Sequence, residues 1–478
     1  MAAYTVRPLP LSQRAAFLIA YPATALSSLS QHITIDKKAS LCKDTTSYFR
    51  NDLCSVLLRN HPHSSRVAGQ TRQNWLALPP MQHPSSSIYR LPFILLCLSS
   101  LLFSASFNML IPELPAYLSS LGGGEYKGLI IALFTLTAGI SRPFSGKLTD
   151  TVGRVPVMAV GSIVCFVCGF LYPVLTSVSG FLFLRLIHGF STGFKPTATA
   201  AYVADVIPRE RWGEAAGIHG LCFSLGMAIG PAVGSAISQA YSISTLFYCS
   251  SVFALLSIVI LMNMKETLPV QQRQRLSPLS FRISRTDIID PRVIPAAIIT
   301  LLSYVAYGAI LTLIPDWTTH LGISNRGVFF VAFTVSSVAI RFFSGRMSDQ
   351  HGRVLIIEYG LAILILSMGI LTWGESPFWL VTGAAVYGIG GGILSPAVNA
   401  WTIDLSSPNQ RGKAMATMYI ALEAGIGLGA LTAGWAYHDR IGRIPYIFFG
   451  TMVVAAVGWL YLRSYKGRTN HQRTSKMM

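Results

Sequence analysis

The stretch Gly146-Lys-Leu-Thr-Asp-Thr-Val-Gly-Arg154 occurs twice in this chain, in closely similar form. The second copy, Gly345-Arg-Met-Ser-Asp-Gln-His-Gly-Arg353, begins 199 residues later. At that shift the chain aligns with itself without gaps for about 90 positions, as expected of an internal repeat. The sequence therefore predicts two halves with the same order of elements. A duplication that serves only packing is the alternative.

The composition is that of a membrane protein. Of the 478 residues, 52% are hydrophobic and 12% are charged, whereas a soluble chain carries about 25% charged residues. This composition argues against a soluble globular enzyme. Apolar runs of about 20 residues recur from Leu91 on, long enough to cross a bilayer as helices. The expected fold is all-α integral membrane, with twelve transmembrane helices in two six-helix pseudo-repeats. The expected spans are 91–118, 126–147, 155–175, 179–206, 213–237, 243–264, 293–317, 326–346, 354–373, 376–405, 413–437 and 444–463.

These spans predict the organisation of the chain. Residues 89–264 and 293–464 form the two helix bundles, 265–292 form a polar linker, and 465–478 form a basic tail. Residues 1–88 are rich in Arg and Ser and poor in acids, and we expect them to be disordered or outside the true protein. Two interpretations remain for them: a start codon placed upstream of Met81, which we favour, or an organellar transit peptide.

The net charge of +18 has two possible meanings. Nucleic-acid binding is excluded because long apolar runs separate the basic residues. The basic residues fall mostly in alternate loops and in the tail, which predicts that both termini and the middle loop are cytoplasmic. We therefore expect a multi-pass protein of the inner (cytoplasmic) membrane. Cys165 and Cys168 form a C-x-x-C without a second pair, so no metal site is expected.

Two further motifs lie on the predicted fourth and fifth spans. The fourth contains Arg185-Leu-Ile-His-Gly189. The fifth contains glycines at wide spacing around a Gly-Pro pair, ending in Ser235. The residues of this second motif are Gly217, Gly226, Gly230, Pro231 and Gly234.

From about Leu91 to its end, the chain resembles the major facilitator superfamily, and within it the twelve-span drug:proton antiporters. The repeated stretch resembles the family's G-x-L-x-D-x-x-G-R signature, the fourth-span motif resembles R-x-x-Q-G with His188 in place of Gln, and the fifth-span motif resembles the antiporter motif with Ser235 in place of its final Gly. The resemblance implies a cytoplasmic gate in which Arg154 pairs with Asp205 and Arg353 with Asp404. It also implies alternating access, with one half rocking against the other around a ligand near mid-membrane. Simple loop anchoring is the alternative for these residues. The gate residues are Gly146, Asp150, Gly153, Arg154, Asp205, Gly345, Asp349, Gly352, Arg353 and Asp404.

Charges on the fourth span point to a central site. At about 100° per residue, Arg185, His188 and Lys195 fall within an arc of roughly 80°. A charge at the bilayer centre costs about 2.5–3.5 kcal/mol on the mildest scale, so this stripe must face a wet cavity or charged partners. The resemblance implies that Arg185 takes part in proton coupling. A buried ion pair for Lys195 and a simple core position for His188 are the alternatives.

Few acids are placed to carry a proton. Glu423 lies near the middle of the eleventh span, and Lys195 at similar depth is its expected partner. Glu113 and Asp316 follow prolines near the outer ends of the first and seventh spans. We expect these two to anchor the outer gate, with a role in the central cavity or in proton coupling as the alternative.

The sequence thus predicts a secondary transporter that exports small hydrophobic or amphipathic compounds in exchange for protons. The alternative is a proton-coupled uptake symporter for a sugar, an organic acid or a siderophore. A receptor on the same fold is a third interpretation. The sequence contains no P-loop, G-x-S-x-G or H-E-x-x-H, so we expect neither an enzyme nor a cofactor, only a proton gradient as energy source. The expected partners are a small-molecule substrate, protons and the lipid bilayer, with the protein monomeric.

Overall fold

The computed structural model describes residues 91–208, 211–274, 289–407 and 411–475. The chain divides into two units, Met1–Ser85 and Ser86–Met478, and all that follows concerns the second. The expected extension 1–88, the middle of the linker and the last residues of the tail lie outside the described residues.

The described part of the chain is helical and contains no strand. The helices before the linker are α6 (Leu91–Asn108), α7 (Leu114–Ser120), α8 (Lys127–Thr151), α9 (Arg154–Leu171), α10 (Val178–Val206), α11 (Trp212–Ala240) and α12 (Ile243–Met262). The helices after it are α13 (Ile294–His320), α14 (Val328–His351), α15 (Arg353–Trp373), α16 (Pro377–Leu405), α17 (Arg411–Tyr437) and α18 (Ile444–Ser475). Single 3₁₀ turns occupy Gly124–Tyr126, Val270–Gln272, Pro291–Val293 and Ile441–Arg443.

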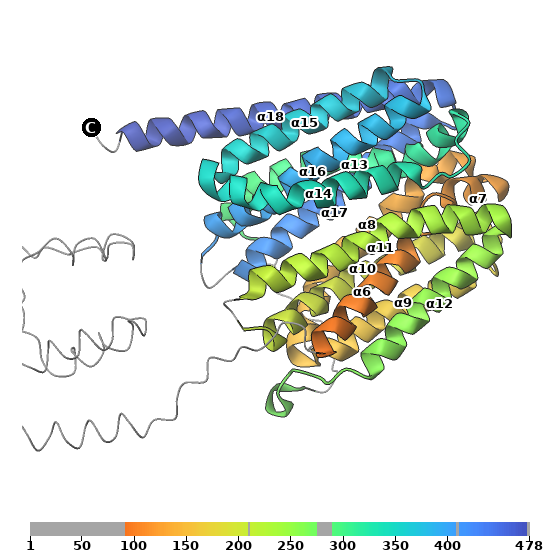
Figure 1. Cartoon of the computed structure of the whole chain (residues 1–478), viewed down its shortest axis with the longest axis horizontal. Coiled ribbons are helices and arrows are strands. Elements are labelled where there is room, and N and C mark those ends of the chain that lie inside the picture. Colours follow the sequence, from red (N-terminus) through yellow and green to blue (C-terminus); the bar gives the residue numbers. More distant parts are fainter. Residues whose placement is uncertain (1–90, 209–210, 275–288, 408–410, 476–478) are drawn as a thin grey trace, which may run out of the picture. The chain divides into compact units, whose positions relative to one another are not determined.

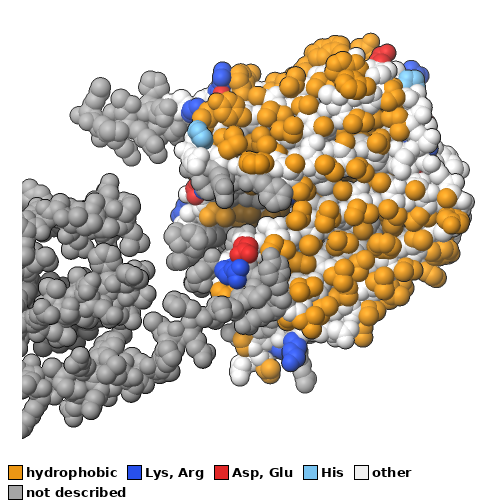
Figure 2. Space-filling view, viewed as in Figure 1, with side chains coloured by type: hydrophobic (Ala, Val, Ile, Leu, Met, Phe, Trp, Pro, Cys, Tyr) orange, Lys and Arg blue, Asp and Glu red, His pale blue; other side chains and the backbone are white. Residues whose placement is uncertain are grey.

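Among the described residues, ten helices are long and apolar enough to cross a membrane. Among the described residues of α14, Val328–Arg341 forms a shorter apolar segment. The helix α10 is not among the ten, since it carries Arg185 and Lys195 within its length. Over the face seen in Figure 2, apolar side chains predominate and charged side chains gather toward its edges.

The first expected span, 91–118, is wrong as a continuous helix. The helix α6 ends at Asn108, and α7 begins at Leu114 with a proline in its first turn. Pro112 lies in the intervening turn, and proline has no N–H to continue a helix. At the other end of the chain, α18 runs on to Ser475, beyond the expected boundary at 463.

Glycines position the repeated stretch at matching helix junctions. Gly153 lies between α8 and α9 with φ 141°, and Gly352 lies between α14 and α15 with φ 90°. L-residues with a side chain rarely adopt such angles, so glycine is the natural residue at both turns. The N-terminus of α10 is capped by the Ser177 hydroxyl, which accepts from the Gly180 N–H at 3.1 Å.

Within each half the helices pack in the same pairs (Figure 1). In the first half α8 packs on α10 and α6 on α11, while in the second α14 packs on α16 and α13 on α17. The close approaches match: Gly226 lies against the Leu101 carbonyl and Gly425 against the Leu301 carbonyl. Ser145 Oγ donates to the Gly193 carbonyl at 2.7 Å, and 199 positions on, Ser344 Oγ donates to the Gly392 carbonyl at 3.3 Å. Between the halves, α8 meets α17 and α11 meets α14.

Candidate functional site

A large cavity of about 1360 Å³ lies between the two halves. Its lining comes from α8, α10 and α11 on one side and from α13, α14, α16 and α17 on the other. It includes Arg142, Arg185, Arg341 and Glu423, and it reaches Lys147 and Asp150 at the end of α8. We call this the Asp150 end of the molecule, and the opposite end, where α8 begins, the Lys127 end.

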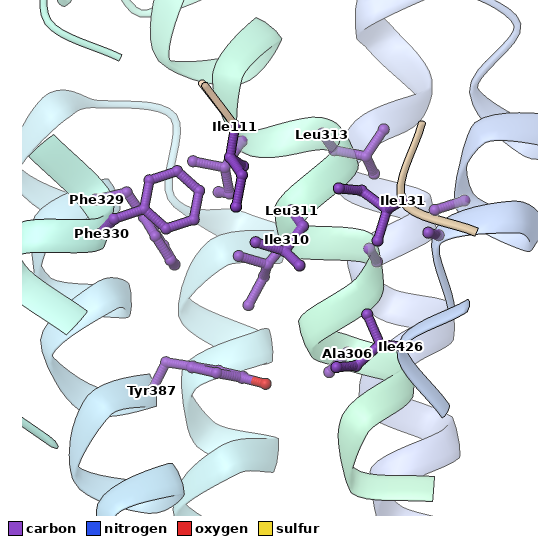
Figure 3. Close-up of a cluster of buried hydrophobic side chains, with 14 of the residues drawn as sticks. Ile111, Ile131, Ala306, Ile310, Leu311, Leu313, Phe329, Phe330, Tyr387 and Ile426 are labelled. Atoms are coloured by element: carbon purple, nitrogen blue, oxygen red, sulfur yellow. The ribbon is translucent and has the colours of Figure 1, made fainter. Parts of the chain in front are cut away.

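An apolar layer closes the cavity toward the Lys127 end. Ile111, Ile131, Leu311 and Ile426 line the cavity and belong to the buried hydrophobic core. Figure 3 shows Ile111 and Ile131 on opposite sides of α13, which carries Leu311. The four side chains come from both halves and are at most 9% exposed, so they give the cavity an apolar wall on this side.

Ion pairs join the two halves at the Lys127 end. Lys127 Nζ lies 2.6 Å from Asp316 Oδ2 on α13 and 2.6 Å from Asp439 Oδ1 beyond α17. Tyr437 OH donates to Asp316 Oδ2 at 2.9 Å. The helix backbones also meet here, because Gly128 on α8 lies against Ala430 and Gly434 on α17. Only glycine permits this approach.

A second set of contacts lies beside α11 at the same end. Arg326 Nη1 lies 2.7 Å from Glu113 Oε2, and the Arg326 N–H donates to Ser235 Oγ at 3.1 Å. Asn325 Nδ2 donates to the Ala232 carbonyl at 3.1 Å. The structure thus places Glu113 and Asp316 outside the cavity lining, in contacts between the halves. Ser235, the departure from the glycine motif, supplies a hydroxyl that glycine lacks.

The Asp150 end has no comparable closure among the described residues. A Cβ built at Gly146, Gly217, Gly220 or Gly412 would meet nothing within 4 Å. Glycine at Gly146 and Gly217 would permit another helix to approach closely, but no such approach occurs there in this conformation. By contrast, Gly226, Gly230 and Gly234 lie directly against the backbone of α6.

The expected pairs of the repeated stretch form within each half. Arg154 Nε donates to Asp205 Oδ2 at 2.9 Å, and Arg353 Nε donates to Asp404 Oδ2 at 3.2 Å. Asp150, with a side chain 75% exposed, lies 3.7 Å from Arg154 Nη1. The side-chain surroundings of Gly345 and Asp349 lie outside what the structure describes.

Glu266 also contributes to this cluster, although its role was not predicted. Its carboxylate accepts from the backbone N–H groups of Arg154 and Val155 at 3.0 and 2.9 Å, so it caps the N-terminus of α9. Acids at a helix N-terminus are a known stabilising feature, but the long separation in sequence concealed this one.

The charged stripe of α10 divides between two environments. Arg185 is 2% exposed and lines the cavity. Its Nε donates to the Ile130 carbonyl at 2.9 Å, and its guanidinium carbon lies 4.6 Å from the centre of the Phe134 ring. His188 lies outside the lining, with Nδ1 3.1 Å from Tyr172 OH and Nε2 3.3 Å from Cys165 Sγ.

Lys195 faces the interior of the first half and does not line the cavity. Its Nζ donates to Ser99 Oγ at 2.9 Å, to Ser162 Oγ at 3.1 Å and to Ser257 Oγ. The expected pair of Lys195 with Glu423 is therefore wrong. Three hydroxyls from α6, α9 and α12 replace the carboxylate as its partners.

The partner of Glu423 is Arg142, which sequence reasoning missed. Arg142 Nη2 lies 2.5 Å from Glu423 Oε1, and both side chains are largely buried. This ion pair crosses between α8 and α17 inside the cavity. The signal was present, because Arg142 aligns with Arg341 at the 199-residue shift, but nothing in the sequence identifies which acid faces it.

Comparison with known proteins agrees with this architecture. A family model described as Major Facilitator Superfamily matches residues 96–340 and 296–476. The multi-drug resistance efflux pump PmrA homolog of Lactococcus lactis is 26% identical over 377 residues, which cover 76% of this chain and 92% of that protein. The quinolone resistance protein NorA of Staphylococcus aureus is 23% identical over 381 residues, or 76% of this chain and 95% of that protein. The crystal structure of the human organic anion transporter MFSD10 (TETRAN) has a similar fold, with a TM-score of 0.62 and 20% identity over 78% of this chain and 98% of that one.

Proposed function

The chain belongs to the Major Facilitator Superfamily, and on this premise we propose that it exports small hydrophobic or amphipathic compounds in exchange for protons. The observation that carries the proposal is the large cavity between the halves, which reaches Lys147 and Asp150 at one end of the bundle, while ion pairs between the halves lie at the other end. Such a cavity is what alternating access requires of one of its two states.

The architecture of the proposal is twelve spans in two parallel six-helix repeats. The matched pairs Ser145–Gly193 and Ser344–Gly392 support it, as do the matched pairs Arg154–Asp205 and Arg353–Asp404. We take the Asp150 end as cytoplasmic, because the loops there carry most of the basic residues. The conformation described above is then the inward-facing one, with both termini on the cytoplasmic side of the inner membrane.

The proposed proton site is the Glu423–Arg142 pair. Protonation of Glu423 removes the charge that holds Arg142, and it thereby weakens a contact between α8 and α17. A proton can then shift the equilibrium between the inward-facing and outward-facing states only through this change in the contact between α8 and α17. Arg185, which shares the cavity, is the second proposed coupling residue.

The direction of transport rests on the glycines of α11 and on the names of the relatives. Gly226, Gly230 and Gly234 lie against α6 as the antiporter motif requires of a closely packed pair. Two of the matched proteins are described as a multi-drug efflux pump and a quinolone resistance protein. Both observations favour export over uptake.

The test is substrate-induced proton movement in inverted membrane vesicles with an imposed pH gradient. Lipophilic cations, organic anions, antibiotics and sugars are added singly, with the full-length wild type beside Glu423→Gln. We expect at least one compound to be pumped inward while the gradient dissipates, and the variant to lose this exchange.

The matched control is Glu358→Gln. Glu358 is also largely buried and forms an ion pair with Arg463 at 2.6 Å, but it lies outside the cavity lining. Outward movement of a sugar or acid together with protons would identify an uptake symporter, and no flux of any compound would favour a receptor.

A further inference from the structure

Three guanidinium groups line the cavity, and among the described residues only one of them has a carboxylate partner. Arg142 pairs with Glu423. Among the residues that the structure describes, no acid lies within ion-pair distance of Arg185 or Arg341. Arg185 is 2% exposed, whereas Arg341 is exposed to the open cavity. Both guanidinium groups therefore line the cavity without a carboxylate of the described chain to neutralise them, and an anionic group of a ligand can take that place.

The internal repeat shows where such an anion fits. At the 199-residue shift, Arg142 corresponds to Arg341 and Glu423 corresponds to Ser224. In one copy Arg142 Nη2 lies 2.5 Å from the Glu423 carboxylate. In the other, Arg341 Nη1 donates to Ser224 Oγ at 3.3 Å. The two contacts are therefore equivalent. Each joins an arginine of one half to the other half, α8 to α17 in the first case and α14 to α11 in the second. The second contact has a hydroxyl where the first has a carboxylate.

Arg185 presents its charge to the same cavity. A guanidinium has five N–H donors, and two hydrogen bonds are formed, from Nε to the Ile130 carbonyl and from Nη1 to Tyr172 OH at 3.4 Å. Its guanidinium carbon lies 4.6 Å from the centre of the Phe134 ring, a contact that does not neutralise the charge. Among the described residues, donors of Arg185 therefore remain for a ligand in the cavity that it lines.

Basic side chains also outnumber acidic ones at the mouth of the cavity, but they do not identify the charge of the substrate. Lys147 and Lys413 line it, against Asp150, and basic residues at this end are explained by membrane orientation. They raise the local concentration of anions approaching the cavity. The inference therefore rests on Arg185 and Arg341.

The rest of the lining suits an aromatic or otherwise apolar body. Tyr307 lies stacked on Tyr387 with ring centres 6.4 Å apart, and Phe107 lies 6.2 Å from Phe134. These rings come from both halves and line the same cavity as the arginines. Guanidinium groups bind carboxylate and sulfonate groups through paired hydrogen bonds.

We propose that the substrate of this cavity is an amphipathic organic anion, whose acidic group is bound by Arg341 and Arg185 and whose apolar body lies among the aromatic side chains. This inference rests on the transport function proposed above and specifies its substrate class. It narrows the expected hydrophobic or amphipathic compounds to those that carry a negative charge.

The test compares four ligands that share one ring system and differ in charge: 2-naphthoate, 2-naphthalenesulfonate, 2-naphthamide and 2-naphthyltrimethylammonium. Their binding to the purified full-length protein in lipid nanodiscs is measured by calorimetry at low and high salt. We expect the two anions to bind about tenfold or more tightly than the amide and the cation. Arg341→Gln lowers anion affinity about ten- to hundredfold, the range for a hydrogen bond to a charged group, and leaves amide affinity unchanged.

A second variant uses the repeat itself. Ser224→Glu gives Arg341 the partner that Arg142 already has, so it too abolishes the preference for anions. Arg443→Gln is the matched control, since Arg443 contacts the Ala436 carbonyl and lies outside the cavity lining. Retained amide binding shows that each variant is folded.

Three outcomes overturn the inference: equal or tighter binding of the cation, anion affinity unchanged in Arg341→Gln, or no binding of any of the four. These outcomes are distinct from failure of the proposed function. If a compound of another class is pumped in exchange for protons, the proposed export function holds and only the anionic substrate class is refuted. If no compound shows any flux, the proposed export function itself is refuted, whichever ligands bind in the calorimetry.

Discussion

The two ends of the helix bundle use similar residues in opposite ways. At the Lys127 end, glycines of facing helices touch and ion pairs join the halves. At the Asp150 end, glycines on α8, α11 and α17 face open space, and the pairs Arg154–Asp205 and Arg353–Asp404 stay within their own halves. In this conformation the Lys127 end is closed and the Asp150 end is open among the described residues. In the alternating access proposed above, contacts at the Lys127 end break when those at the Asp150 end form.

The largest effect is expected from breaking the ion pairs that close the Lys127 end. Lys127→Met leaves Asp316, whose side chain is 14% exposed, without its cation. Removing one member of a buried pair costs about 3 kcal/mol, or roughly a hundredfold shift between states. Spin labels on Tyr241→Cys and Tyr446→Cys, both 77% exposed at this end, measure the separation of the halves. We expect the distance between the labels to increase in Lys127→Met.

Asp439→Asn is the control, because Asp439 is the more exposed partner of Lys127, and it should give a smaller change in this distance. An unchanged distance in Lys127→Met would show that these ion pairs do not hold the Lys127 end closed.

A pair of glycine substitutions tests the two ends against each other. In Gly128→Val, the added Cβ lies 2.5 Å from the Ala430 carbonyl oxygen and 2.9 Å from Gly434 Cα, so the Lys127 end cannot close fully. In Gly146→Val the added group meets nothing in this conformation. Overpacking costs about 1–3 kcal/mol. Both variants should lose transport, but Gly128→Val lengthens the distance between the labels and Gly146→Val keeps it short. A shift in the same direction for both would refute the assignment of Gly146 to closure of the other end.

The next effect concerns the repeated stretch itself. Asp150 is largely exposed here, so Asp150→Asn should not alter the closed Lys127 end. We expect it to slow turnover about tenfold at unchanged expression, because the carboxylate is used when the Asp150 end closes. Glu214→Gln is the control, an exposed acid at the same end that forms an ion pair with Arg211 within its own half. Normal turnover in Asp150→Asn would favour simple loop anchoring.

These comparisons show which parts of the site the sequence could predict. The pair Arg154 with Asp205 within one half followed from the family resemblance, and the repeat extended it to Arg353 with Asp404. Pairs between halves, such as Lys127 with Asp316 and Arg142 with Glu423, did not follow, because local spacing does not determine the register of one bundle against the other. The first span differs from its expected bounds because Pro112 interrupts it, and the last because α18 continues to Ser475.

The error at Lys195 has a geometric cause. At about 100° per residue, Arg185 and Thr192 lie about 20° apart on α10, whereas His188 and Lys195 lie about 60° and 80° from Arg185. The structure brings the first two to the cavity and leaves the other two inside the first half. An arc of roughly 80° was wide enough to span both environments, so a shared stripe did not imply a shared cavity.

A double-mutant cycle sharpens this correction. Lys195→Ala and Glu423→Gln should now be additive in their effect on transport within about 0.5 kcal/mol, as expected of sites without shared partners. Arg142→Gln with Glu423→Gln should be strongly non-additive, because the two side chains form one ion pair. Coupling in the first cycle as large as that in the second would mean that Lys195 reaches Glu423 in another state of the protein.

The smallest effect is expected at Ser235, where the chain departs from the glycine motif. Its hydroxyl accepts from the Arg326 N–H at 3.1 Å, a bond between the halves. Ser235→Ala removes this acceptor and keeps the helix, at a cost of about 1 kcal/mol. The same label pair should therefore show a modest increase in the open population, clearly below that of Lys127→Met. Ser179→Ala, an exposed serine at the same end of the molecule, is the control. If Ser235→Ala matches the control, the serine only fills the position of a glycine. If it shifts the population as expected, the departure from the motif stabilises closure of the Lys127 end.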